Sequence, residues 1–313
     1  MVQVSERASA PGSVSVSDER TPLSTILIYA SPAPCIGFMF FLVSMYLMKF
    51  STDVLLIAPG VMGLIFGISR IWDGISDPLA GYFSDRTNTR IGRRRPWLLA
   101  SLVPIVAVFL MVWSPPQTLT GTALVVWMAV GVIGFYTAMT IFGVPHASLG
   151  AELSMSYDDR NRVFGWRHIC FMSGSFLAIG GMQLLIASDT PRVTATRVAL
   201  VASLLTVLVM LFCVARVRER PEHMGRGAEN PFLAFRDVLG NPHARRLLVV
   251  ALIEHLGSAN ITILTPYASH YIIGTPHRPR SSCSATWSLP SRRLSSGCGW
   301  PSATTRSSFG CSR

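Results

Sequence analysis

The chain has 313 residues, of which 50% are hydrophobic and only 14% are charged, and its formal net charge at pH 7 is +11. With a mean hydropathy of +0.43, this composition excludes an ordinary soluble globular protein. The positive charge does not indicate a nucleic-acid-binding protein either, because the basic residues lie in short gaps between apolar runs and not on one soluble surface.

The first 22 residues are polar and mixed in charge. We expect residues 1–22 to form a disordered tail. The apolar run that follows is too long for the hydrophobic region of a cleaved signal peptide, so no such peptide is expected.

Apolar runs of roughly 20 residues recur along the chain, the length that a helix needs to cross ~30 Å of hydrocarbon. In lipid such runs must be helical. We predict seven spans, at 24–49, 54–82, 97–113, 120–143, 166–187, 196–214 and 247–273. Arginines follow the second, fourth and sixth runs, so the positive-inside rule places the N-terminus and these loops in the cytoplasm of a multi-pass inner-membrane protein.

The order of the spans predicts a six-helix bundle at 23–215, a cytoplasmic connector at 216–246 and a seventh helix at 247–273 that would begin a second bundle. From 274 to 313 the composition changes to Ser, Arg, Pro and Cys without an apolar period. This stretch is basic on what would be the external side, against the positive-inside rule. We interpret it as a frameshifted tail, and a genuine disordered tail is the alternative.

Three charged residues interrupt the second span. Arg70, Asp73 and Asp77 are three and four residues apart, so their side chains lie on one face of a helix. An ionisable group costs at least ~2.5 kcal/mol there. Two carboxylates four residues apart repel unless a cation lies between them or one binds a proton. A static ion pair with Arg70 is the alternative, but one arginine cannot balance both aspartates, which favours a coupling-ion site.

The stretch at 81–97 reads as a tight, arginine-rich cytoplasmic turn. Gly81 permits close helix approach, Gly92 can take a positive φ, and Asp85 can accept charge-assisted hydrogen bonds from arginines or from a helix N-terminus. We predict a cytoplasmic gate that latches neighbouring helices. Its members are Gly81, Asp85, Arg86, Gly92, Arg93, Arg94, Glu152 and Arg160, with Glu152 able to pair with Arg160 or Arg162.

Five segments together resemble a known family: residues 46–54, 70–78, 92–97, 137–145 and 159–167. They are similar to the major facilitator superfamily and, within it, to the glycoside-pentoside-hexuronide:cation symporters typified by melibiose permease. The resemblance covers approximately residues 29–276. It implies an all-α integral membrane fold, the N-terminal six-helix bundle of that superfamily plus a seventh transmembrane helix, truncated at its C-terminal side.

The resemblance assigns roles to individual residues. It implies that Asp73 and Asp77 are ligands of a sodium ion or proton, with Thr140 an oxygen ligand from the fourth helix. It also implies that Arg167 lines the substrate cavity.

One departure bears on the substrate. Family members that carry galactosides have acidic residues where this chain has Gly37 and Gly143. A melibiose-like mode of sugar binding is therefore not supported, and the case for sodium over protons is weaker. Because this branch of the superfamily includes lysolipid carriers, an amphipathic substrate stays an alternative.

Further residues are candidates for the substrate cavity. Arg70, on the same helical face as Asp73, is one of them. Trp127 and Tyr136 in the fourth span could stack on a sugar ring, although packing or interface anchoring is the more common role of such aromatics. Glu254 in the seventh span, with Asn260, could contribute to the central cavity.

We therefore predict a cation-coupled symporter of a sugar or glycoside-like solute, present here as an inactive truncated chain that lacks a C-terminal half. The alternatives are a carrier of an amphipathic or lysolipid-like substrate, and a membrane scaffold or regulatory subunit without transport. No nucleophile–base pair, metal-ligand cluster or phosphate loop is visible, so an enzyme is not expected. The expected partners are the solute and the lipid bilayer, with no nucleic acid and no cofactor beyond the coupling ion.

Overall fold

The computed structural model describes residues 20–154, 156–217, 219, 240–250, 253, 254 and 257. The predicted tail at 274–313, most of the predicted disordered tail, most of the connector and Asn260 lie outside the described residues. So does most of the predicted seventh span, although residues 242–250 are helical.

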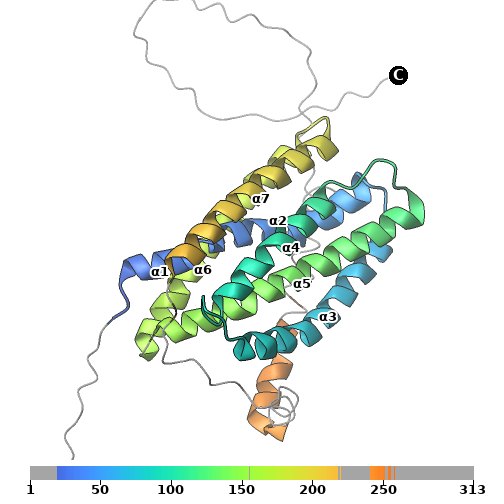
Figure 1. The fold of residues 1–313 in the computed structure, drawn as a ribbon. Coiled ribbons are helices and arrows are strands. Elements are labelled where there is room, and N and C mark those ends of the chain that lie inside the picture. The colour runs from blue at the N-terminus through green and yellow to red at the C-terminus, as the bar shows by residue number, and fades with distance from the viewer. Residues whose placement is uncertain are drawn as a thin grey trace, which may run out of the picture. The chain divides into compact units, whose positions relative to one another are not determined.

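The described residues form α-helices and no strand. Figure 1 shows the long helices gathered into a bundle with short connections. In chain order the helices are α1 (Leu23–Ala30), α2 (Ala33–Asp53), α3 (Pro59–Arg86), α4 (Arg95–Trp113), α5 (Gly121–Leu153), α6 (Tyr157–Ile186) and α7 (Pro191–Arg216). The predicted all-α membrane fold is confirmed.

Five segments of the described chain are long and apolar enough to cross a membrane: Leu23–Asp53, Arg95–Trp113, Gly121–Leu153, Tyr157–Ile186 and Pro191–Arg216. Helix α3, predicted as the second span, has 28 residues and is long enough. It is not among the five because its polar and charged residues, Arg70, Asp73 and Asp77 included, lower its hydropathy.

The first predicted span is two helices, because two prolines interrupt it. Pro32 and Pro34 have no backbone N–H to continue the helical ladder. The Ser31 hydroxyl donates to the Ile28 carbonyl at 2.7 Å. His146 on α5 lies 3.0 Å through Nε2 from the Tyr29 carbonyl. Carbonyls at the break are thus satisfied from outside the helical ladder.

Two helices at one end of the bundle are longer than predicted. Helix α5 continues to Leu153, ten residues past the predicted end at Gly143, with Pro145 inside it. Helix α6 begins at Tyr157, where the predicted span began at 166, because the Ser156 hydroxyl caps it by accepting the Asp159 N–H at 3.1 Å. Both extensions carry charged residues to this end of the bundle.

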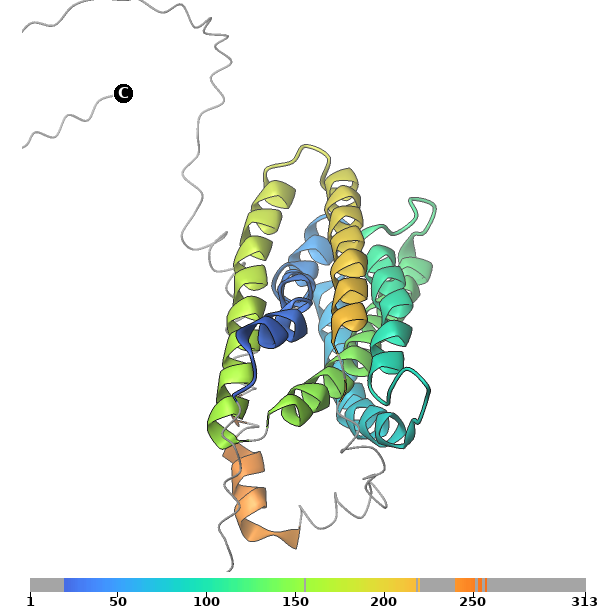
Figure 2. The ribbon, with the colours of Figure 1, turned by 60° about the vertical axis from the view of Figure 1, so that its left-hand side comes forward.

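Helix α2 packs on α6, α4 lies against α5 and α7, and α3 lies against α5. Figure 2 shows α6 and α7 as neighbours joined by a short loop. An aromatic cluster fills the core beside α4, where Trp113 stacks on Tyr46 with ring centroids 6.3 Å apart and contacts Phe50 and Phe109. This packing joins α2 to α4, while α3 and α5, which carry the site described below, pack directly on each other.

Candidate functional site

The charged face of α3 lies against α5. Arg70 Nη1 is 3.4 Å from Asp73 Oδ2, and Arg70 Nη2 donates to the Tyr136 hydroxyl at 3.0 Å. The guanidinium also sits over the Tyr136 ring, 4.3 Å from its centroid. The predicted cavity residues Arg70 and Tyr136 are therefore brought together, with Asp73 beside them.

One helical turn further along both helices, Thr140 donates through Oγ1 to Asp77 Oδ1 at 2.7 Å. Tyr136 and Thr140 are four residues apart on α5, which matches the spacing of Asp73 and Asp77 on α3. The Thr140 hydroxyl oxygen keeps its lone pairs while it donates, so it can also serve as a ligand. The structure thus groups the three residues predicted as cation ligands on one helix pair.

The second oxygen of Asp73, Oδ1, is buried and has no hydrogen-bond partner in the described part of the chain. The Asp73 side chain is 21% exposed, and that of Arg70 is 53% exposed. A buried carboxylate oxygen without a partner is unfavourable. The cluster has two carboxylates and one guanidinium, so a bound cation or proton would satisfy Asp73 Oδ1 and balance the charge.

Sequence reasoning missed one polar contact of this cluster. Trp72 donates through Nε1 to the Thr137 hydroxyl at 2.8 Å, and its side chain remains 40% exposed. Both residues fall inside the motif segments, which was the available signal. The partly exposed indole offers a flat apolar surface on α3, and its partner Thr137 is adjacent in sequence to Tyr136, which binds Arg70.

The other cavity candidates are not in this cluster. Trp127 donates to the Met111 carbonyl on α4 at 2.9 Å, and it lies nine residues, ~13 Å, along α5 from Tyr136. Arg167 on α6 is half-buried, with its guanidinium 6.0 Å from the centre of the Phe164 ring. Glu254 is exposed.

Gly37 and Gly143 stand where galactoside carriers have acidic residues, and the structure explains why position 37 holds glycine. A Cβ on Gly37 would collide with the backbone carbonyl of Phe171, and one on Gly174 with the carbonyl of Pro34. Helices α2 and α6 therefore touch backbone to backbone at these glycines, and Gly37 leaves no space for a side chain. By contrast, a Cβ on Gly143 has nothing within 4 Å.

The predicted gate lies at the end of the bundle that carries Arg93, Arg94 and Arg95, which we call the arginine-rich end. Arg94 is 2.5 Å from Asp85 and 3.2 Å from Glu152, and it donates to the Ser84 hydroxyl at 2.7 Å. Arg93 pairs with Glu152 as well. These bonds join α3, α4 and α5.

The expected partner of Glu152 was wrong. Glu152 pairs with the arginines of the α3–α4 loop because α5 continues far enough to carry it there. Asp159 lies 4.0 Å from Arg162 instead, and Arg160 is exposed.

Two further gate residues have ordinary contacts. A Cβ on Gly81 would lie 3.6 Å from Val144, which is normal van der Waals contact, so close approach does not require glycine there. Arg86 stacks over the ring of Tyr82, with its guanidinium carbon 4.1 Å from the ring centre.

A residue that sequence reasoning missed completes the arginine-rich end. The Glu219 carboxylate, just after α7, accepts the backbone N–H groups of Arg93, Arg94 and Arg95 at 2.7, 2.9 and 2.7 Å. Gly92 precedes them with φ of +122°, and a Cβ there would lie 2.6 Å from Glu219 Oε1. The prediction of a positive φ at Gly92 is confirmed.

Arg95, at the start of α4, binds the C-terminal end of α7 through its side chain. Its Nε and Nη2 donate to the Val214 carbonyl at 3.0 and 2.6 Å, near the C-terminus of α7. The start of α4 therefore binds an anion and the end of α7 binds a cation, as helix dipoles favour. These contacts tie α7 and the start of the connector to the α3–α4 loop.

Comparison with known proteins shows the family of this chain. A family model described as "MFS/sugar transport protein" matches residues 28–279. The chain belongs to this MFS/sugar transport protein family. The resemblance to glycoside:cation symporters of the major facilitator superfamily is thereby confirmed.

Several curated relatives of this family member are symporters by name. An uncharacterized symporter, sll1374, of Synechocystis sp. is 30% identical over 220 residues, which cover 66% of this chain and 40% of that protein. The inner membrane symporter YicJ of Escherichia coli is 28% identical over 183 residues, which cover 58% of this chain and 40% of that protein. The sodium-dependent lysophosphatidylcholine symporter 1 of Xenopus tropicalis is 33% identical over 151 residues, which cover 47% of this chain and 28% of that protein. The chain thus spans two-fifths or less of the length of these relatives.

Proposed function

We propose that this chain supplies the cation-binding bundle of a cation-coupled symporter. Asp73, Asp77 and Thr140 hold the coupling ion, which is sodium or a proton and is carried as a substrate. The observation that carries the proposal is the buried Oδ1 of Asp73, which has no hydrogen-bond partner among the described residues. It lies beside Arg70 and one helical turn from the Asp77–Thr140 bond.

The coupling follows from electrostatics. With the site empty, two carboxylates face one guanidinium, and the excess negative charge opposes closure of a low-dielectric cavity around it. A bound cation removes that excess and allows the loaded carrier to close. Ion and solute then bind with positive cooperativity, and each raises the affinity for the other by the same factor.

The proposed solute is a sugar or glycoside. Arg70 and Trp72 both reach α5, where Arg70 contacts Tyr136 and Trp72 contacts Thr137, and their exposed parts supply a hydrogen-bond donor and an apolar face. Sugars present the complementary combination of hydroxyl oxygens and an apolar ring face. Arg167 on α6 is a further proposed cavity residue, and Glu254 and Asn260 are proposed for the opposite wall.

We also propose the topology that the arginine distribution indicates. The arginine-rich end, with Arg93, Arg94, Arg95 and Glu219, faces the cytoplasm of an inner membrane, and the N-terminus lies on the same side. In this arrangement the gate contacts among α3, α4, α5 and the connector hold one access state of the carrier.

A second candidate is a carrier of a lysolipid-like amphiphile. The similarity to the sodium-dependent lysophosphatidylcholine symporter favours it, and so does the absence of acidic side chains at Gly37 and Gly143. Its cation site would be the same. A scaffold without transport is the third candidate, and it requires no cation binding.

The test is equilibrium binding to the purified chain in nanodiscs, in sodium buffer and in choline buffer of equal ionic strength, each at two pH values. The probes are p-nitrophenyl glucoside, p-nitrophenyl glucuronide and palmitoyl-lysophosphatidylcholine. Sodium-dependent or pH-dependent binding of a glycoside supports the first candidate, and the same dependence with the lysolipid alone supports the second. Binding without any cation dependence would contradict the proposed coupling.

A further inference from the structure

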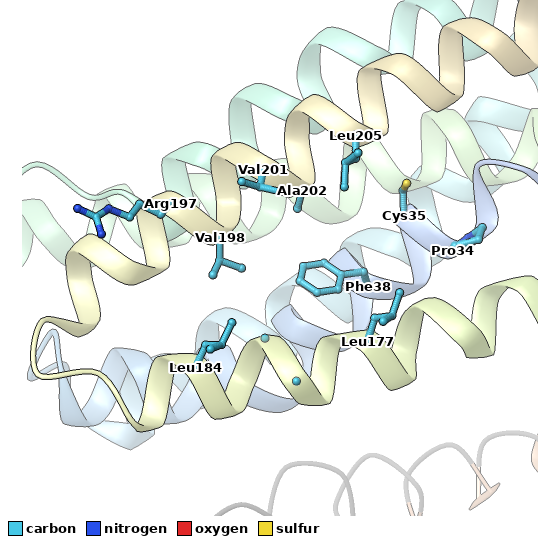
Figure 3. Close-up of a pocket in the computed structure, with 12 residues that line it drawn as sticks. Pro34, Cys35, Phe38, Leu177, Leu184, Arg197, Val198, Val201, Ala202 and Leu205 are labelled. Carbon is cyan, nitrogen blue, oxygen red and sulfur yellow. The ribbon is translucent and has the colours of Figure 1, made fainter. Parts of the chain in front are cut away.

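A second feature lies away from the α3–α5 cluster, where α2, α6 and α7 border a cavity of about 540 Å³. Figure 3 shows Arg197 at one end, Pro34 and Cys35 at the other, and Phe38 between α6 and α7. We call this cavity the α6–α7 groove. Its volume lies in the range of small-molecule sites, ~300–1,000 Å³.

The groove is open because α6 carries glycine there. A Cβ on Gly180 would have nothing within 4 Å, whereas one on Gly181 would lie 3.1 Å from the Phe38 ring. The space beside Gly180 is therefore unfilled by any side chain of the described residues. Leu177 and Leu184 flank it on α6 and are 68% and 62% exposed.

The groove opens on an apolar outer face of the bundle. Val201 and Leu205, which line it from α7, are 60% and 50% exposed. Leu204 and Leu208 on the same helix are 61% and 56% exposed. Such an exposed apolar face is compatible with the hydrocarbon chains of a bilayer, which are as apolar as leucine side chains.

Among the described residues that line the groove, Arg197 is the single charged one. It lies six residues after the start of α7, which is ~9 Å into the helix. In the described part of the chain no ion pair or hydrogen bond of its side chain is found. An unpaired cation inside a membrane span is costly, and such a group reaches toward the interface or pairs with an anion.

The dimensions match one lipid chain. Arg197 and Leu205 are eight residues apart, so the groove runs ~12 Å along α7. One leaflet contributes ~15 Å of hydrocarbon, half of ~30 Å. An apolar groove of this length with a guanidinium at its outer end is complementary to an acyl chain below an anionic phosphate.

We propose that the α6–α7 groove binds an anionic phospholipid of the surrounding bilayer, with one acyl chain beside Gly180 and the phosphate at Arg197. The acyl chain fills the space that no side chain of the described residues fills, and the phosphate neutralises Arg197, for which those residues supply no partner. This lipid site is separate from the proposed cation and solute site and does not depend on it.

The test is native mass spectrometry of the full chain in mild detergent with equimolar palmitoyl-oleoyl phosphatidylglycerol and phosphatidylcholine. We expect one retained phosphatidylglycerol per chain, about fivefold preferred over phosphatidylcholine. Arg197→Gln should abolish the preference. Gly180→Leu, whose side chain enters open space, should reduce retention of both lipids at least fivefold.

Matched controls come from the same helices. Arg192→Gln removes a charge from α7 outside the groove, and Gly165→Leu adds a side chain on α6 where a Cβ also has nothing within 4 Å. Both should retain lipid like the unmodified chain. Equal retention by the groove variants and these controls would overturn the proposal. So would preferential displacement of the diacyl lipid by lysophosphatidylglycerol, because the groove would then belong to a single-chain solute.

Discussion

Replacing Glu219 tests whether one carboxylate holds the start of α4. The Glu219 carboxylate accepts hydrogen bonds at 2.7–2.9 Å from three backbone N–H groups, those of Arg93, Arg94 and Arg95. A hydrogen bond to a charged group contributes ~1.5–3 kcal/mol, and an anion at a helix N-terminus ~0.3–1 kcal/mol, up to ~2 when partly buried. Glu219 is half-buried, so in Glu219→Ala water can replace part of the lost hydrogen bonding to the three N–H groups. We therefore expect the local stability at the start of α4 to fall by ~2–3 kcal/mol.

The assay is hydrogen–deuterium exchange of the peptide that contains residues 93–95, in detergent or nanodiscs. A loss of ~2–3 kcal/mol corresponds to roughly 30- to 150-fold faster exchange of these amides, since 1.4 kcal/mol is a factor of ten. Glu219→Gln, which keeps an acceptor oxygen but not the charge, should fall between. Asp158→Ala, an exposed carboxylate at the same end of the bundle, is the control. Unchanged exchange in Glu219→Ala would refute the reasoning.

Two further predictions concern helix contacts. Gly37→Ala places a Cβ on the Phe171 carbonyl and should destabilise the chain by about 3 kcal/mol, at the upper end of overpacking costs. The control Gly143→Ala adds a Cβ where there is open space, so its thermal midpoint should be unchanged or raised. Equal midpoints for the Gly37 and Gly143 variants would contradict the close contact between Gly37 and Phe171. His146→Phe keeps a buried ring but removes the Tyr29 carbonyl partner, so we expect ~1–3 kcal/mol lost by thermal unfolding. Recovery in His146→Gln would attribute that loss to the hydrogen bond.

The charged face of α3 could be predicted from sequence because it depends only on local geometry. Arg70, Asp73 and Asp77 share a face by helical spacing alone. Their partners on α5, Tyr136 and Thr140, could not be derived this way, since contacts between helices depend on the crossing geometry. Thr140 was found through the resemblance to a family, which carries tertiary information that periodicity does not.

Glu219 shows what sequence patterns leave out. Its partners are backbone N–H groups, which every residue except proline possesses, so no side-chain pattern marks them. The surrounding connector is rich in arginine, and this favoured a reading in terms of membrane topology. The remaining signal was Gly92, whose positive φ was predicted but whose role in admitting the carboxylate depends on the fold.

The predicted end of the fourth span was wrong for an identifiable reason. The predicted end of the fourth span was near Gly143 because Pro145 usually interrupts a helix. Helix α5 continues instead, since the residues beyond Pro145 make tertiary contacts: His146 stacks on Tyr29, and Glu152 pairs with Arg93 and Arg94. Those contacts also explain why the expected pairing of Glu152 was wrong.

The most direct test of the proposed cation site is isothermal titration of sodium into the purified chain in nanodiscs, with proton release followed in parallel. The account predicts one saturable cation-binding event per chain. Asp73→Asn and Asp77→Asn should each weaken it at least tenfold, whereas Asp158→Asn should not change it. Identical isotherms and identical proton release in all four proteins would contradict the assignment of α3 and α5 as a coupling-ion site.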